Sequence, residues 1–174
     1  MSQHTPFTPA GESRSHSLET PLRGSYSLAH SNWKASYMNK PVSPEEALIF
    51  VMVMASAVDN AMAEKELIRI GQLIDILPVF ENFDKEGLIE VSQRCAALLS
   101  GPEGLDIVLE TIRDALPEWL HETAYALAVE IAAVDLSVRA EELRLLQMLR
   151  DRLGLDKLTC AALERSASAR YRGL

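Results

Sequence analysis

The stretch AVDNAMAEKELIRIGQLIDIL at residues 57–77 recurs on the same plan as AVDLSVRAEELRLLQMLRDRL at residues 133–153. At a constant offset of 76 residues, the identical positions include Ala57/Ala133, Val58/Val134, Asp59/Asp135, Glu66/Glu142, Leu67/Leu143, Leu73/Leu149 and Leu77/Leu153. In each copy an apolar helix leads to an Asp, a short polar break follows, and a Glu seven residues after the Asp opens an amphipathic helix. The repeat predicts two similar helix-turn-helix units.

Helical patterns continue outside the repeat. A helix start is clear at residue 43. Ser43 is a good N-cap, Pro44 fits the first helical position, and Glu46 completes a capping box. The run 47–58 is apolar nearly all round, so we expect this helix at the centre of a bundle. Six more helices are predicted near residues 63–77, 84–98, 105–116, 120–134, 143–153 and 156–169. The predicted fold is an all-α bundle of seven helices with an internal pseudo-twofold duplication.

The charge of the chain is strongly acidic and unevenly spread. The 174 residues carry a net charge of −8, whereas residues 1–41 carry about +2, so the remainder carries about −10. An acidic surface repels phosphate, which argues against nucleic acid as a partner. Cations, or a basic protein surface, suit such a charge better.

Residues 1–41 differ in composition from residues 42–174, which we take as the helical domain. The first segment holds four of the eight prolines, many serines and no helical period. Such composition predicts either a disordered tail or a segment that folds on a partner. The docking alternative depends on four aromatic residues that could serve as anchors: Phe7, Tyr26, Trp33 and Tyr37.

The acidic turns of the repeat are the candidate metal ligands. Asp59 and Glu66 are seven residues apart, as are Asp135 and Glu142, and this interval also occurs in the second half of an EF-hand loop. An EF-hand is nevertheless excluded, because apolar residues stand two and four positions before each Asp: Ala57 and Ala55, Ala133 and Ile131. Two interpretations stay open, helix capping by the glutamates and a weak site for a divalent cation, calcium or manganese. Glu130 either lies exposed to solvent on its helix or adds a further carboxylate near the acidic turns.

Catalytic motifs are incomplete. His121 opens H-E-T-A-Y, but Tyr125 stands where a metalloprotease helix needs its second His. Cys95 and Cys160 lie among alanines and leucines without metal-ligand spacing, so we expect buried, inert thiols. The three other histidines lie in the first 41 residues, so His121 is the only histidine of the helical domain that could pair with a nucleophile. The sequence therefore predicts no enzyme and no catalytic residue.

The paired acidic segments resemble the tellurite-resistance protein TerB family, over about residues 44–170. The same module is similar to the N-terminal domain of DjlA-type membrane-anchored co-chaperones. The resemblance implies a TerB-like fold, no catalytic activity, and acidic patches at Asp59, Glu66, Asp135 and Glu142 with metal-linked or partner-linked roles in stress response. The family usually has Asp-Gly at each turn; Leu136 follows Asp135 here and does not readily take a left-handed conformation, so we expect a distorted second turn.

The function expected from these observations is a non-catalytic, TerB-like interaction module that binds a protein partner, with a divalent cation at the acidic turns. The alternative is an accessory subunit that attaches to a larger, membrane-associated assembly through residues 1–41. The longest apolar run, 47–58, is shorter than the ~20 residues a bilayer crossing needs, so no transmembrane segment is expected. We expect a cytoplasmic location, peripheral to the inner membrane.

Overall fold

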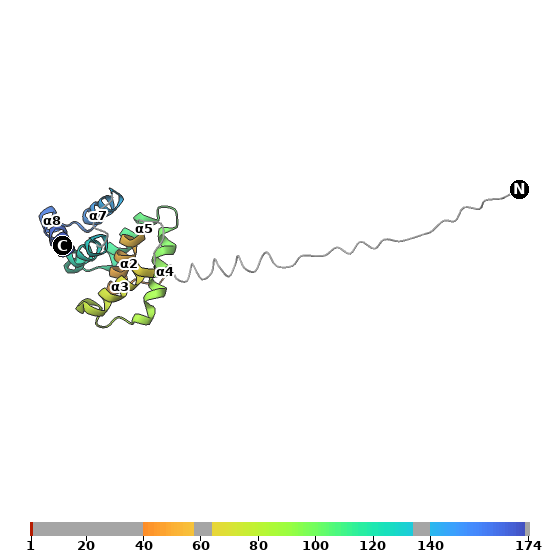
Figure 1. Ribbon diagram of the computed structural model, residues 1–174, viewed down its shortest axis with the longest axis horizontal. Coiled ribbons are helices and arrows are strands. Elements are labelled where there is room, and N and C mark those ends of the chain that lie inside the picture. Colours follow the sequence, from red (N-terminus) through yellow and green to blue (C-terminus); the bar gives the residue numbers. More distant parts are fainter. Residues whose placement is uncertain (2–39, 58–63, 134–139, 173–174) are drawn as a thin grey trace. The chain divides into compact units, whose positions relative to one another are not determined.

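The computed structural model describes residues 1, 40–57, 64–133 and 140–172, without the side chains of residues 64–66. This part of the chain contains seven α-helices and no strand (Figure 1), as the sequence predicts. The α-helices are α2 Pro44–Ser56, α3 Glu64–Ile76, α4 Leu88–Leu99, α5 Gly104–Ala115, α6 His121–Ala132, α7 Ala140–Leu153 and α8 Lys157–Arg170. Three 3-10 helices join them: η2 Pro78–Phe80, η3 Lys85–Gly87 and η4 Glu118–Leu120. All these helices belong to one compact unit, Tyr37–Leu174.

Helix α2 lies in the middle of the helical unit (Figure 1). The Glu46 backbone N–H donates to the Ser43 hydroxyl at 3.2 Å, and the Ser43 N–H donates to the Glu46 carboxylate at 3.1 Å, so the predicted capping box is present. Residues 47–54 are each at most 2% exposed. Helices α3, α4, α5 and α6 all contact α2, so residues 47–56 of the apolar run are buried as predicted.

The residues predicted to interrupt helices do so. Helix α3 ends just before Pro78, which begins η2, and α5 ends before Pro117, which directly precedes η4. Gly154 follows α7 with a φ of +68°, a conformation that favours glycine. The Leu155 N–H then bonds the Arg150 carbonyl at 3.0 Å, closing the helix C-terminus.

Gly104 allows a close approach between α4 and the first turn of α5. A Cβ at this position would lie 2.4 Å from the carbonyl oxygens of Leu98 and Leu99. Glu103, immediately before it, has a φ of 55°. Any larger side chain at residue 104 would displace backbone, so the tight α4–α5 connection depends on this glycine.

A buried ion pair joins the start of α2 to α4. The Arg94 guanidinium lies 3.0 Å from the Glu46 carboxylate, and the two side chains are 4% and 10% exposed. The same guanidinium lies 5.3 Å from the centroid of the Phe50 ring. Burial raises the pKa of Glu46, but the Ser43 N–H and the charge of Arg94 outweigh it, so the pKa lies below its usual value.

Helix boundaries follow the sequence repeat. Helices α3 and α7 begin at Glu64 and Ala140, which are 76 positions apart, and α2 and α6 end at Ser56 and Ala132, with the same separation. The pseudo-twofold relation between the two helix-turn-helix units of the repeat, and their TerB-like character, stay predictions. None of the helices described combines the length and apolar character required to cross a membrane.

Candidate functional site

Two 3-10 helices, η2 and η4, shape the surface that we take as the candidate site. The Leu77-Pro78 pair opens η2 and the Leu116-Pro117 pair directly precedes η4. Each turn is anchored by a side chain in the core: Phe80 is 1% exposed and Leu120 is 4% exposed. Because proline fixes φ and donates no backbone N–H, each pair ends the preceding α-helix and redirects the chain. The two turns thereby contribute to one surface beside the first turns of α2 and α6.

An open groove of about 590 Å³ lies between these elements, and we call it the Trp119 groove. Its apolar lining consists of Pro44, Leu77, Pro78, Val79, Pro117, Trp119 and Leu120. The Trp119 side chain is 76% exposed, although it is among the largest apolar side chains of the chain. Concave apolar surfaces of this kind, with an exposed aromatic residue, are typical of interaction sites.

The charges around the Trp119 groove are negative. Glu45 contributes to the lining and accepts a hydrogen bond from the Ser43 hydroxyl at 2.8 Å. Glu118 lies between Pro117 and Trp119, and Glu122 follows on the first turn of α6; both are exposed. None of the described lining residues is a Lys or Arg. The groove therefore presents apolar contact area with one acidic lining residue, Glu45, while Glu118 and Glu122 are exposed and adjacent in sequence to lining residues. We call these three glutamates the acidic rim.

The four acids of the predicted cation turns are only partly described. Asp59 and Asp135, with the turn at Leu136, lie outside the described residues, and Glu66 lies in the first turn of α3 without a described side chain. Glu142 lies in the first turn of α7 and is 7% exposed. Among the side chains that the structure describes, no group of three or more His, Cys, Asp or Glu could hold a metal ion.

The segments that flank the two turns nevertheless meet. Ala57, at the end of α2, and Glu141, in the first turn of α7, line one hollow of about 350 Å³ together with Met54 and Arg144. The first turn follows Ala57 directly, and the second ends just before Ala140. The end of the first helix of one unit therefore lies beside the start of the second helix of the other.

The aromatic residues of the predicted docking segment, Phe7, Tyr26, Trp33 and Tyr37, also lie outside the described residues. Their role in binding a partner stays a prediction.

Glu130 is neither a solvated flank nor free to join an acidic site. Its carboxylate pairs with Arg69 of α3 at 3.0 Å, pairs with Arg170 of α8, and accepts a hydrogen bond from the Tyr171 hydroxyl. Burial and the hydrogen bond to Glu130 raise the pKa of Tyr171. The cluster links three helices, so we assign Glu130 a structural role.

His121 lies at the opposite end of α6, about 13 Å along the helix axis from Glu130. Its Nδ1 is 3.0 Å from the Leu153 carbonyl oxygen and donates to it, which joins α6 to the end of α7. His121 and Glu130 therefore do not converge on one pocket.

Both thiols are buried, as the sequence predicts. Burial raises the pKa of Cys95 to about 12, in spite of the neighbouring Arg94 charge. Burial also raises the pKa of Cys160. Beside Cys160, the Tyr125 hydroxyl donates to the Glu164 carboxylate at 2.6 Å, and burial followed by this bond raises the pKa of Tyr125.

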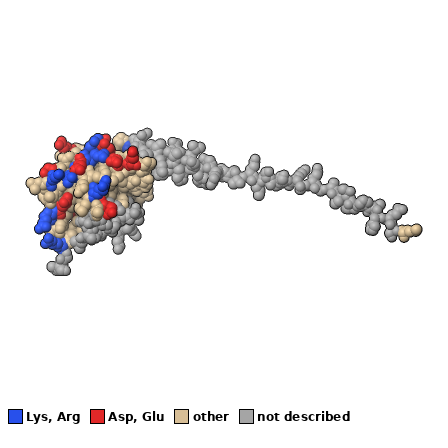
Figure 2. Space-filling view, turned by 90° about the horizontal axis from the view of Figure 1, so that it is seen from above, with Lys and Arg blue, Asp and Glu red and all other residues tan. Residues whose placement is uncertain are grey.

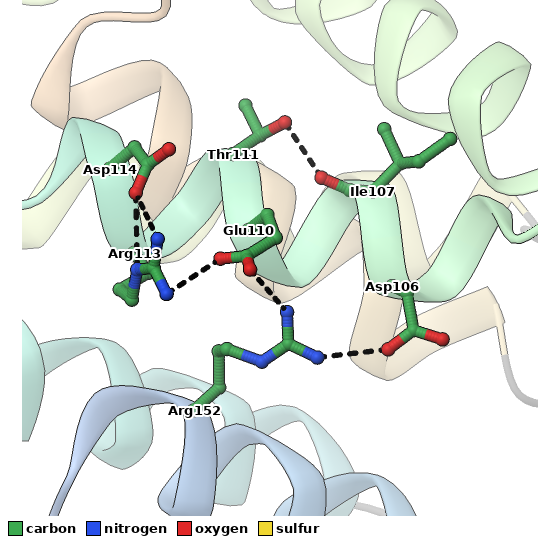
Figure 3. A network of polar contacts seen from close by, with 7 residues as sticks. All are labelled: Asp106, Ile107, Glu110, Thr111, Arg113, Asp114 and Arg152. Carbon is green, nitrogen blue, oxygen red and sulfur yellow. Dashed lines mark hydrogen bonds and ion pairs between the residues drawn. The ribbon is translucent and has the colours of Figure 1, made fainter.

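A charged network on the outer side of α5 is fully paired among the residues drawn (Figure 3). Arg152 of α7 lies 2.9 Å from Asp106 and 3.3 Å from Glu110, and Arg113 lies 2.9 Å from Glu110 and 2.8 Å from Asp114. On the face shown in Figure 2, acidic and basic side chains are likewise interspersed. These contacts join α5 to α7.

The Trp119 groove is not predicted from the sequence. A signal was present: Leu77-Pro78-Val79-Phe80 and Leu116-Pro117-Glu118-Trp119 share a Leu-Pro-x-aromatic pattern. The pattern predicts two turns, but it does not tell which aromatic side chain is buried. Phe80 lies in the core, whereas Trp119 is exposed.

Comparisons with protein-family models, with curated proteins and with solved structures find no match to this chain. A functional proposal therefore rests on its own residues and contacts.

Proposed function

We propose that this chain is a non-catalytic interaction module that binds a protein partner through the Trp119 groove. The observation that carries the proposal is the 76% exposure of Trp119 in a proline-lined groove with an acidic rim. Leaving a large aromatic surface in water has a free-energy cost that burial against a partner removes. Aromatic residues in such places supply a large share of binding energy in protein interfaces.

The candidate catalytic groups support a non-catalytic role. Glu130 is paired with Arg69 and Arg170, and His121 donates to a backbone carbonyl. The thiols are held in the protonated form by burial. These contacts stabilise helix packing, and they leave the groups poorly placed to act on a substrate.

The experiment is an affinity purification from the source cells with quantitative mass spectrometry, using the full chain and two variants. Trp119→Ala removes the exposed indole, and Leu158→Ala is the matched control, because Leu158 is 79% exposed on α8 and does not line the groove. We expect at least one partner to be retained by the wild type and by Leu158→Ala but lost from Trp119→Ala. Equal recovery with all three proteins would refute the proposal.

A second candidate function is cation binding at the acidic turns, in the TerB-like role that the sequence resemblance implies for stress response. It is supported by the hollow that Ala57 and Glu141 line together, because one residue that flanks each turn borders this hollow. If calcium or manganese binds there, either ion should raise the melting temperature of the wild type. Asp59→Ala combined with Asp135→Ala should abolish that rise. If neither ion changes the melting temperature of the wild type, the proposal is refuted.

A further inference from the structure

The chemistry of the Trp119 groove indicates which class of partner segment it accepts. Three of its lining residues, Pro44, Pro78 and Pro117, have no backbone N–H. Two of its walls are 3-10 helices, so they offer no strand edge for main-chain pairing. A bound segment must therefore be held mainly by side-chain packing on the prolines and on Trp119.

Apolar packing against an exposed indole favours a segment that is extended before it binds. A polyproline II segment meets this requirement, since its conformation is preformed and little entropy is lost on binding. Its proline rings can stack on Trp119, and its solvated carbonyl groups can accept from the indole N–H. An amphipathic helix would need a continuous apolar trough along a helix pair, whereas helix starts and turns line this groove.

The acidic rim selects the charge of the segment. Glu45 lines the groove, and Glu118 and Glu122 are exposed on the elements that carry Trp119 and Thr123. The basic residues closest in sequence are already paired: Lys40 with Glu46 at 3.4 Å, Arg113 with Glu110 and Asp114, and Lys85 with Asp75. Basic side chains in the partner would complement this rim, whereas anionic lipid headgroups would be repelled.

We propose that the Trp119 groove binds a proline-containing, basic segment of a partner protein in the polyproline II conformation. This inference rests on the proposed function, because it names the class of partner for the same surface. It assigns Trp119 the role of apolar anchor and the rim acids the role of charge selection.

The test uses full-length protein and a fluorescent synthetic peptide of alternating proline and leucine with arginines at both ends. Fluorescence anisotropy should give micromolar affinity that weakens as salt is raised, because the rim acids are exposed. Trp119→Ala should weaken binding by about tenfold or more. Glu118→Gln with Glu122→Gln should weaken it less and reduce the salt dependence, and Leu158→Ala should leave it unchanged.

Three peptide and vesicle controls separate the alternatives. A peptide with glutamates in place of the arginines should bind weakly, and so should a basic amphipathic helical peptide without proline. Anionic lipid vesicles should not bind. Absence of binding to the arginine–proline peptide, equal binding of the glutamate peptide, or stronger binding of the helical peptide or of vesicles would overturn the inference. A cellular partner that depends on Trp119 would, in that event, still support the proposed function.

Discussion

Replacing Arg94 with methionine tests the account of the core most sharply. The substitution keeps an unbranched side chain in place but leaves the Glu46 carboxylate buried without its guanidinium partner. Removing one member of a buried ion pair costs about 3–5 kcal/mol. The lower end of that range applies here, because Lys40 and the Ser43 N–H still face Glu46. We expect a loss of about 3 kcal/mol in the free energy of unfolding, and a melting temperature lower by about 10 °C.

The assay is urea unfolding followed by circular dichroism, with Arg113→Met as the matched control. Arg113 is 46% exposed and pairs with acids on the surface, so its loss should cost much less than the loss of Arg94, because solvent screens exposed pairs. Equal costs for the two variants, or a cost below about 1 kcal/mol for Arg94→Met, would refute the reasoning.

The pH dependence of the same variant gives an independent check. The pKa of Glu46 is lowered from 4.5 in the folded protein, so its contribution to stability is present above about pH 4.5 and is lost as pH falls through the folded pKa. Arg94→Met removes one cause of the lowering. The stability difference between wild type and variant should therefore shrink as pH falls below about 4.5, and a constant difference would contradict this assignment.

Two further predictions concern the packing of the helices. Gly104→Ala should destabilise the protein by about 2 kcal/mol or more, because its Cβ would meet the carbonyl oxygens of α4. Gly87→Ala is the control and should not destabilise the protein, because there is open space around its Cβ. Equal melting temperatures for the two variants would contradict the close approach. Cys95 should not react with a thiol reagent at neutral pH in the folded protein, because its pKa is raised to about 12. Both cysteines should react once urea unfolds the chain, and rapid native labelling of Cys95 would show that this part of the core opens.

Local sequence signals are sufficient to predict the helices. Ser43 and Pro44 mark the start of α2, Pro78 and Pro117 mark interruptions, and Gly154 marks the end of α7, because each residue acts through its own backbone or that of its neighbours. The burial of α2 also follows from its sequence, since a helix that is apolar all round has no face for water.

The candidate site depends on contacts between distant segments, and for that reason the sequence does not reveal it. Trp119 and Phe80 occupy equivalent places in a similar local pattern, yet only the packing of η2 and η4 on the core decides which ring is exposed. The role of Glu130 likewise depends on Arg69 and Arg170, which lie 61 and 40 positions away along the chain. Asp59 and Asp135 lie outside the described residues, so the cation interpretation stays a prediction.

The most direct test of the central claim compares the partners retained by the wild type, by Trp119→Ala and by Leu158→Ala. Both variants truncate an exposed apolar side chain, so each should change the free energy of unfolding by less than about 0.5 kcal/mol, and equal stability can be verified by urea unfolding. If the groove is the binding surface, Trp119→Ala alone loses a partner. If all three folded proteins retain the same partners in the same amounts, the Trp119 groove is not the site of interaction.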